Sequence, residues 1–388
     1  MRETLRIGID ATAIPLKRVG AGNYIFNLVR SLANVDHDND YIVFARPEHT
    51  EEWGIRRRNF RFIQIPHRTR GTRVAWEQFV LPRQLSQCGA DILHSPHYTM
   101  PLLNSCRSVV TFCDMTFFLY PEMHTATKRL MFRWIMRRSA RRAARIITIS
   151  KSTADDVIRV LGLPKEKLSV VPLGVSAAYR PITDEQVLRE VCARYSLVPH
   201  EYLLYVGVLE PRKNVPRLLH AYALLRKSGV RHPLVLVGRR GWKYDDVFRT
   251  LEALRLGNDV VFTNHVPEGD LPALYCGARV FVYPSIYEGF GLPVLEAMAC
   301  GTPVVTSNIS SMPEVAGDAA LLIEPRDHEQ MASAIESVLV DEGLRQSLRE
   351  RGLKRASVYT WDKTARETLK VYEFACDDIL RGVNTIPS

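Results

Sequence analysis

The sequence lacks the features that would tie it to a membrane interior, a disulfide framework or a zinc site. No apolar run approaches the roughly 20 residues of a membrane-spanning helix. Met1–Asp10 is charged and has no apolar core of the kind found in secretory signals. The seven cysteines are scattered, odd in number and without a C-x-x-C pair, which argues against disulfide-rich and zinc-binding classes. We therefore expect a cytoplasmic protein whose cysteines are small buried side chains.

A dinucleotide-binding fingerprint is also missing from the start of the chain. The first predicted strand, Leu5–Asp10, continues into Ala11 and Thr12 and a long loop, where G-x-G-x-x-G would be required. This argues against a dinucleotide-dependent oxidoreductase. What is present is the composition of a globular protein: 388 residues, 46% hydrophobic and 24% charged, which suits two domains of ordinary size.

Positive charge is concentrated in the first half of the chain. Residues 1–180 hold 28 Lys and Arg against 15 Asp and Glu, whereas the remainder holds 24 against 27. The net charge of +10 therefore belongs to the first half. Such asymmetry points to an anionic partner: a membrane surface, a nucleic acid or a polyphosphate.

The stretch Tyr283–Thr306 is predicted to be a strand, a glycine-rich turn, a helix and a second strand. The helix is predicted over Leu292–Ala299, because Pro293 suits the first helical position. Glu288 then lies in the turn and Glu296 in the first helical turn. Both carboxylates are expected to converge on the amino-terminal end of the helix.

This end of the helix combines groups that bind phosphates and sugars. The backbone N–H groups of the turn Gly289-Phe290-Gly291 and the positive pole of the helix suit a phosphate. Carboxylates next to phosphates are better acceptors for sugar hydroxyls than phosphate ligands. The pattern favours a sugar-nucleotide site; the alternative is two ordinary glutamates stabilised by the helix dipole.

Several motifs together resemble a known family. The segment EGFGLPVLEAMACGTPVV resembles the signature of retaining glycosyltransferase family 4, and the resemblance extends over nearly the whole chain. It implies an α/β protein with the GT-B fold, in which two Rossmann-like, doubly wound parallel-sheet domains face a central cleft. The other matching motifs are LEPRKN at 209–214, Pro313-Glu314-Val315 and VGAGNY at 19–24.

Alternating strands and helices agree with two such domains. We expect residues 1–175 to form an N-terminal Rossmann-like acceptor-binding domain and 176–365 a C-terminal Rossmann-like nucleotide-sugar-binding domain. Residues 366–388 are expected to be a helix that crosses back to the first domain. Strands are predicted at 5–10, 41–44, 60–65, 92–95, 109–112, 146–149 and 168–171, then at 202–206, 234–237, 260–262, 280–283, 304–305 and 320–323.

Two adjacent cations, Arg212 and Lys213, stand between a predicted strand and helix, where an anion site is favoured. The resemblance assigns them to the donor diphosphate and makes them catalytic together with Glu288, which binds sugar hydroxyls and is no covalent nucleophile. Many relatives have Arg directly after the first glycine, where this chain has Val208, so Arg212 is expected to supply that charge. The implied donor-binding set is Gly20, Gly22, Gly207, Arg212, Lys213, His265, Val266, Glu288, Gly289, Phe290, Gly291, Leu292 and Glu296.

The acceptor side is expected in the first domain. Relatives usually carry His-Asp where this chain has Cys113-Asp114. Cys113 cannot replace an imidazole closely, so either a cleft residue or a packed cysteine is expected there, beside the retained Asp114. His94 and His97 are further cleft candidates, although a lone histidine is more often structural.

The resemblance also implies the reaction. It predicts retention of configuration, a nucleotide sugar as the substrate, no cofactor and no metal; no D-x-D signature accompanies the donor motifs. Similarity to bacterial O-antigen and exopolysaccharide mannosyltransferases makes GDP-mannose the first expected donor, with a UDP- or dTDP-sugar as the alternative. The expected acceptor is lipid-linked or an oligosaccharide in surface polysaccharide synthesis.

A basic stripe recurs at helical spacing, with Leu130, Met131, Trp134 and Ile135 as its apolar side. It indicates either a solvated face or an anionic membrane surface, on the inner face of the cytoplasmic membrane. A nucleic-acid- or membrane-binding protein without catalysis is the alternative of a different class; it would leave the Glu, Gly and Arg-Lys pattern unexplained, so no nucleic acid is predicted. The stripe consists of Arg129, Arg133, Arg137, Arg141 and Arg145.

Overall fold

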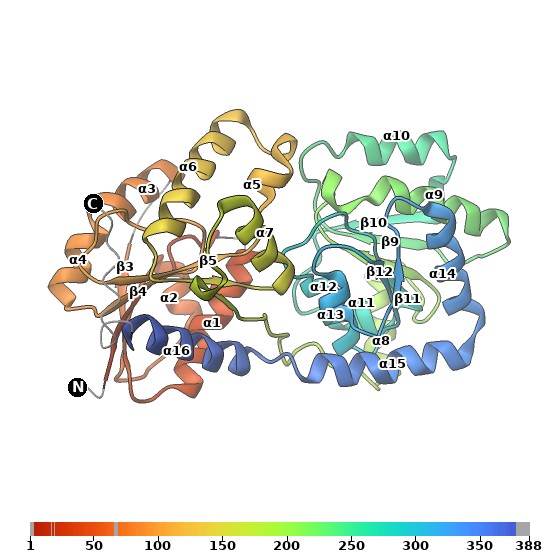
Figure 1. Ribbon diagram of the computed structural model, residues 1–388. Coiled ribbons are helices and arrows are strands. Elements are labelled where there is room, and N and C mark those ends of the chain that lie inside the picture. The colour runs from red at the N-terminus through yellow and green to blue at the C-terminus, as the bar shows by residue number, and fades with distance from the viewer. Residues whose placement is uncertain (1–3, 17, 19, 66–68, 378–388) are drawn as a thin grey trace. The chain divides into compact units, whose positions relative to one another are not determined.

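The computed structural model describes residues 4–16, 18, 20–65 and 69–377, and it divides into two compact units (Figure 1). Unit 1 comprises Met1–Gly174 and Trp361–Ser388, and unit 2 comprises Val175–Thr360. The sequence placed these boundaries after residues 175 and 365. Residues 378–388 of the predicted last segment lie outside the described residues.

The described part of unit 1 is built on a seven-stranded parallel sheet in the order β3-β2-β1-β4-β5-β6-β7. Its strands are β1 (Arg6–Asp10), β2 (Asp40–Ala45), β3 (Phe60–Gln64), β4 (Ile92–Ser95), β5 (Arg107–Phe112), β6 (Arg145–Thr148) and β7 (Leu168–Val170). Its helices are α1 (Ala21–Val35), α2 (Pro47–Trp53), α3 (Arg70–Phe79), α4 (Leu81–Cys88), α5 (Thr116–Leu119), α6 (Ala126–Arg142), α7 (Lys151–Leu161) and α16 (Trp361–Asp377), with short 3₁₀ turns η1 (Pro121–Met123) and η2 (Lys165–Lys167).

The core of unit 1 follows from strands that are apolar on both faces, as is typical of a parallel sheet covered by helices. Ile7 and Ile9 on β1 and Val109 on β5 are fully buried. Gly8 lies against Leu85 of α4, where an added Cβ would come within 2.7 Å of a methyl carbon. The small residue therefore lets the helix approach the central strand.

Helix α16 belongs to unit 1 although it is far from that unit in sequence (Figure 1). Trp361 stacks on Tyr24 of α1 with ring centroids 6.5 Å apart. The Thr364 hydroxyl donates to the Pro172 carbonyl at 2.7 Å. These contacts fix α16 to α1 and to the segment that follows β7.

The described part of unit 2 holds a six-stranded parallel sheet in the order β10-β9-β8-β11-β12-β13. Its strands are β8 (Leu203–Val206), β9 (Leu234–Val237), β10 (Val260–Asn264), β11 (Val280–Tyr283), β12 (Val304–Ser307) and β13 (Leu321–Ile323). Its helices are α8 (Glu185–Ala193), α9 (Val215–Lys227), α10 (Asp245–Ala253), α11 (Leu271–Cys276), α12 (Leu292–Ala299), α13 (Met312–Ala316), α14 (His328–Val340) and α15 (Glu342–Ser357), with 3₁₀ turns η3 (Pro211–Lys213) and η4 (Gly257–Asp259).

Two consecutive helices, α3 and α4, follow β3 in unit 1. The chain breaks at Val80, which ends α3 and precedes α4. Pro82 explains the break, because it has no N–H to continue the hydrogen bonds of α3 and instead stands in the first turn of α4, where that N–H is not needed.

Candidate active site

The polar centre of unit 2 forms where the chain leaves β8 and β11 at their carboxyl ends, the edge at which parallel α/β sheets bind ligands. Asn214, in left-handed backbone at φ 59°, follows η3. Its side-chain amide donates to the carbonyls of Pro284 at 3.1 Å and Pro325 at 2.6 Å. Three loops of the same sheet edge are thereby held together.

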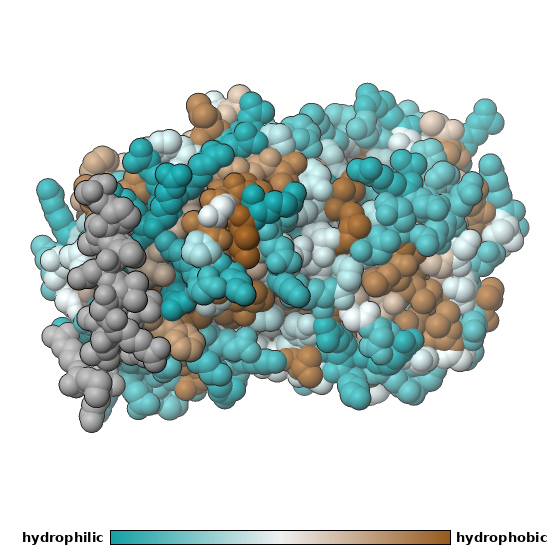
Figure 2. Space-filling view, viewed as in Figure 1, coloured by the Kyte–Doolittle hydropathy of each residue, from teal (hydrophilic) through white to brown (hydrophobic). Residues whose placement is uncertain are grey.

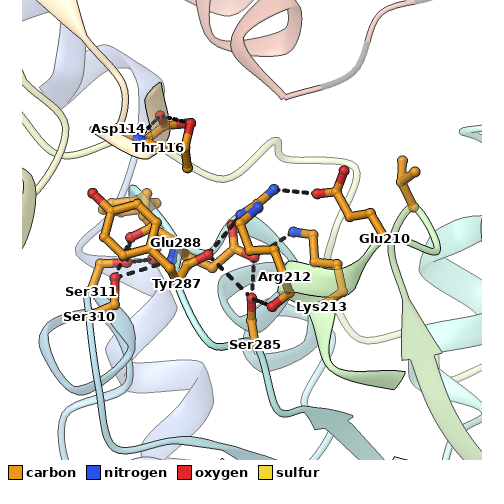
Figure 3. Close-up of polar contacts among 12 residues, drawn as sticks. Asp114, Thr116, Glu210, Arg212, Lys213, Ser285, Tyr287, Glu288, Ser310 and Ser311 are labelled. Carbon is orange, nitrogen blue, oxygen red and sulfur yellow. Dashed lines mark hydrogen bonds and ion pairs between the residues drawn. The ribbon is translucent and has the colours of Figure 1, made fainter. Parts of the chain in front are cut away.

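Glu288 is the centre of this network and is 8% exposed. One carboxylate oxygen accepts from Arg212 Nη1 at 2.6 Å. The other accepts from Lys213 Nζ at 2.5 Å, from the Tyr283 hydroxyl at 3.0 Å and from Ser285 Oγ at 2.7 Å. Figure 3 shows the cations and the serine pointing toward this one carboxylate.

Arg212 is held by further contacts on both of its terminal nitrogens. Nη1 also donates to the Tyr287 carbonyl at 2.8 Å, and Nη2 donates to Glu210 Oε1 at 2.7 Å (Figure 3). A buried charge is tolerated only when it is paired and hydrogen-bonded, and each charge in this group meets that condition.

The electrostatics of the group keep Glu288 ionised. Burial raises the pKa of Glu288, but the charges of Arg212 and Lys213 outweigh it, and the pKa falls to about 2. The pKa of Lys213 is lowered by burial and by Arg212, against the opposing effect of Glu288. The site therefore presents a permanent carboxylate between two cations.

Two serines after β12 fix the turn that carries Glu288. The Glu288 N–H donates to Ser310 Oγ at 3.1 Å, and the Glu288 carbonyl accepts from Ser310 Oγ at 2.6 Å and Ser311 Oγ at 2.9 Å (Figure 3). Ser311 Oγ also lies 2.8 Å from the Phe290 carbonyl. The turn is thus ordered before any ligand is bound.

Gly291 caps the amino-terminal end of α12 at φ 108°, in backbone that L-residues rarely adopt. A Cβ there would lie 2.2 Å from Met312 Cε. The backbone angle favours glycine at this position whatever the space, and the terminal methyl of Met312 would have to move to admit a side chain.

Glu296 lies in the second turn of α12, and its predicted place in the first turn was wrong. The helix starts at Leu292, with Pro293 as its second residue, so the first four positions end at Leu295. Glu296 Oε2 accepts from the Tyr275 hydroxyl of α11 at 2.9 Å. Burial raises the pKa of Glu296 to about 7; the Tyr275 hydrogen bond lowers it and Glu268 raises it.

Other predicted donor residues lie along the same edge. His265 is exposed and Val266 is 3% exposed; both follow β10, which β9 and β8 separate from β11. Gly207 directly follows β8 and donates its N–H to the Val237 carbonyl at 2.8 Å. Phe290 is buried against Tyr359, with centroids 5.9 Å apart.

The predicted residues of unit 1 occupy two places. Gly20 caps α1 at φ 52° and Gly22 is buried in its first turn, while residues 17 and 19 of this loop lie outside the described residues. Cys113 is 8% exposed, and burial followed by the Asp114 charge raises its pKa. A protonated, packed thiol is therefore expected there.

Asp114 and His97 have local partners. Asp114 Oδ1 accepts from the N–H of Thr116 at 3.0 Å and from its hydroxyl at 2.7 Å, which orders the start of α5 (Figure 3). The His97 ring, partly exposed, meets Tyr98 edge to face with centroids 4.6 Å apart.

The interpretation of His94 as a cleft residue was wrong. Its ring is fully buried and is joined to the Tyr372 hydroxyl at 2.7 Å and to Thr111 Oγ1 at 2.8 Å. Burial lowers the pKa of His94 to about 3, so the ring is neutral. It connects β4 and β5 to α16 in the interior of unit 1.

The basic stripe also differs from its prediction. Helix α6 ends at Arg142, and Arg145 begins β6. Leu130 is 74% and Trp134 50% exposed, whereas Ile135 is 6% exposed. The helix packs through Ile135, Met136, Ser139 and Ala140, since the two small residues allow close approach.

Sequence reasoning missed several members of the site. Tyr283 and Ser285 contact Glu288 directly, Ser310 and Ser311 hold its backbone, and Tyr275 binds Glu296. The only sequence signal was the position of Tyr283 at a strand end and of the serines after the next strand. Among residues 4–377, leaving out the masked positions, no cluster of three or more His, Cys, Asp or Glu side chains could hold a metal ion.

Comparison with solved structures shows that the chain has the GT-B fold. Sucrose-phosphate synthase from Thermosynechococcus elongatus superposes with a TM-score of 0.76 at 21% identity, covering 95% of this chain and 98% of that one. HepE of Anabaena, in complex with UDP-glucose, superposes with a TM-score of 0.73 at 17% identity, covering 95% and 99%. The predicted fold is confirmed.

Sequence comparison then identifies the family. Residues 19–179 match the model described as Glycosyltransferase Family 4, and residues 197–355 match Glycosyl transferases group 1. The chain is 38% identical over 283 residues to O-antigen chain mannosyltransferase B of Escherichia coli, covering 73% of this chain and 74% of that one. The chain belongs to glycosyltransferase family 4.

Proposed function

We propose that the protein transfers mannose from GDP-mannose, with retention of configuration and without a metal, to a lipid-linked or saccharide acceptor in surface polysaccharide synthesis. The observation that carries this proposal is the ionised Glu288 held between Arg212 and Lys213 beside the amino-terminal end of α12. Two cations suit a diphosphate, and a carboxylate with a pKa of about 2 suits neutral sugar hydroxyls.

In this proposal, Arg212 and Lys213 stabilise the charge that develops on the departing diphosphate. The bond between the anomeric carbon and the β-phosphate oxygen breaks as the acceptor oxygen bonds to the same carbon. The acceptor proton passes to the departing phosphate. Glu288 positions the sugar through its hydroxyls and forms no covalent bond.

Glu296 is proposed to accept hydrogen bonds from the ribose hydroxyls. Its position on α12, one turn beyond the positive pole of the helix, suits a ribose that follows the diphosphate. A carboxylate accepts such bonds only when ionised, so its pKa of about 7 links nucleotide binding to pH.

The identity of the nucleotide-sugar donor is the most specific part of the proposal. The Escherichia coli relative is a mannosyltransferase acting on an O-antigen chain, whereas the Anabaena structure holds UDP-glucose. A UDP- or dTDP-sugar is therefore the alternative donor for this chain. Thermal stability in the presence of GDP, UDP, dTDP, NAD and a short DNA duplex separates these cases, because a ligand that binds only the folded state raises its stability.

Selective stabilisation by GDP, lost in Glu296→Ala, supports the proposal. Stabilisation by UDP or dTDP alone changes the donor, and a response to NAD or DNA alone contradicts the function. Transfer of labelled mannose from GDP-mannose to a membrane extract then tests the reaction itself.

We also propose that unit 1 meets an anionic membrane surface through α6. The described residues contain no helix long and apolar enough to cross a membrane. Exposed Leu130 and Trp134 lie among arginines, with Arg138 Cζ 4.4 Å from the Trp134 ring centroid, and Figure 2 shows apolar and hydrophilic side chains intermixed in this region. Such a face suits headgroups and shallow insertion. The test is sedimentation of the protein with lipid vesicles. The wild type is expected to sediment with anionic vesicles and not with neutral ones, and Leu130→Ala/Trp134→Ala is expected to lose this binding. Salt-sensitive retention on DNA, without binding to vesicles, would contradict the proposal.

A further inference from the structure

A polar cavity lies in unit 2 at the edge of the sheet opposite to Glu288. Arg279 precedes β11 and Pro303 precedes β12, whereas Glu288 follows the end of β11. Four residues of strand separate the two edges by about 13 Å. The cavity has a volume of about 200 Å³, and its lining includes Cys276, Arg279, Gly301, Glu342, Arg345 and Arg349.

Three guanidinium groups and one carboxylate line this cavity, and two of the four are committed to each other. Arg345 Nη1 donates to the carbonyls of Val338 and Leu339 at the end of α14, both at 2.7 Å. Its Nη2 forms an ion pair with Glu342. Arg345 therefore satisfies two carbonyl groups at the carboxyl end of α14, and its positive charge neutralises most of the negative charge of Glu342.

The other two guanidinium groups retain unused donors. Arg279 Nη2 lies 3.9 Å from Glu342, too far for a hydrogen bond, and Arg279 Nε is buried without a hydrogen-bond partner among the described residues. The bond that joins Arg349 Nη1 to the Gly301 carbonyl is long, at 3.3 Å. Each of these two guanidinium groups therefore keeps terminal N–H donors for an acceptor in the cavity.

His232, just before β9, lies close enough to Arg279 and Arg345 for their charges to affect its pKa. Its Nδ1 is buried and has no hydrogen-bond partner within the described part of the chain. Burial lowers the pKa of His232, and the charges of Arg279 and Arg345 lower it further against the opposing effect of Glu201. Two arginine charges thus act on this half-buried ring.

We propose that this cavity binds a phosphoryl group, as inorganic phosphate or as a small phosphomonoester, through Arg279 and Arg349. Planar guanidinium groups offer paired donors that match phosphate oxygens. The volume is below the about 300–1,000 Å³ of pockets that enclose drug-sized ligands, so it suits a phosphoryl group and not a nucleotide sugar. The site is separate from the diphosphate position assigned to Arg212 and Lys213.

The test measures thermal stabilisation by inorganic phosphate against chloride at equal ionic strength. Four proteins are compared: wild type, Arg279→Gln/Arg349→Gln, Lys213→Met and the control Arg249→Gln, whose side chain is 75% exposed on α10. Phosphate is expected to stabilise the wild type, Lys213→Met and the control, while the double variant binds at least about tenfold more weakly. Retained GDP binding shows that the double variant is folded.

Three results overturn the proposal: no stabilisation of the wild type beyond chloride, equal stabilisation of the double variant, or loss only in Lys213→Met, which would place phosphate in the candidate active site. If the double variant does not fold, Arg279→Lys keeps the charge, removes the paired donors and is expected to weaken phosphate binding. Glycerol 3-phosphate is measured beside inorganic phosphate. Tighter binding of one identifies whether a phosphomonoester or free phosphate is the natural ligand.

Discussion

Glu296 is expected to make nucleoside diphosphate binding weaken as the pH falls. Its pKa is about 7, because burial outweighs the hydrogen bond from Tyr275. If only the ionised carboxylate accepts bonds from the ribose, the binding-competent fraction falls from about nine-tenths at about pH 8 to about one-tenth at about pH 6. The dissociation constant of GDP is then expected to rise about tenfold over that interval.

Calorimetric titration of GDP at three pH values measures this effect, with Glu296→Gln as the matched variant. The phosphate of GDP itself titrates near pH 6 and contributes a pH dependence of its own. That contribution is shared by both proteins, so the difference between them isolates Glu296. Glu296→Gln is expected to bind more weakly at about pH 8 and to lose most of the pH dependence. Equal pH dependence in both proteins would refute the assignment of Glu296 to the ribose.

Three further predictions concern stability. The pKa of Glu288 is about 2 in the folded protein against 4.5 ordinarily, so its ionisation contributes about 3 kcal/mol above pH 4.5 that is lost as the pH falls through 2. Glu288→Gln should unfold at a lower urea concentration than the wild type near pH 7, and the difference should shrink in acid; equal urea midpoints near pH 7 would refute this. Gly291→Ala should lower the melting temperature and weaken GDP binding, because φ is 108° and the terminal methyl of Met312 must move to admit the new methyl; unchanged GDP binding would contradict this. Tyr372→Phe should cost about 1–3 kcal/mol in urea unfolding by removing a partner of buried His94, while leaving GDP affinity unchanged; a loss of GDP affinity would argue against a purely structural role.

Local pattern was enough to predict the central element of unit 2. The strand Val280–Tyr283 and the helix Leu292–Ala299 were placed at the residues observed, because apolar runs, glycines and one proline mark their ends within the sequence itself. The range of the helix was right, but Pro293 was taken as its first position although it is the second, and the place of Glu296 was counted from it. A single position is enough to move a side chain from the first turn to the second.

Tertiary contacts could not be predicted in the same way. The ion pairs of Glu288 join residues 75 and 76 positions apart, and no local signal states that these loops meet. His94 was misassigned because a histidine at a strand end has the same sequence signature whether it faces solvent or, as here, the buried helix α16. Leu130 and Trp134 belong to the apolar side that the sequence predicts, yet both are exposed, because periodicity finds an apolar stripe but not what covers it.

Glu288 in the turn before α12 and Glu296 on α12 have different surroundings, and their carboxyl groups therefore differ in protonation. Glu288 faces two cations and stays ionised, whereas Glu296 faces tyrosine and another glutamate and titrates near neutrality. If the proposed function is right, an incoming diphosphate competes with Glu288 for Arg212 and Lys213. The carboxylate oxygens that those cations now occupy then become acceptors for sugar hydroxyls. Donor binding would thus exchange one set of charge-assisted bonds for another, which limits the free energy lost when the buried ion pairs open.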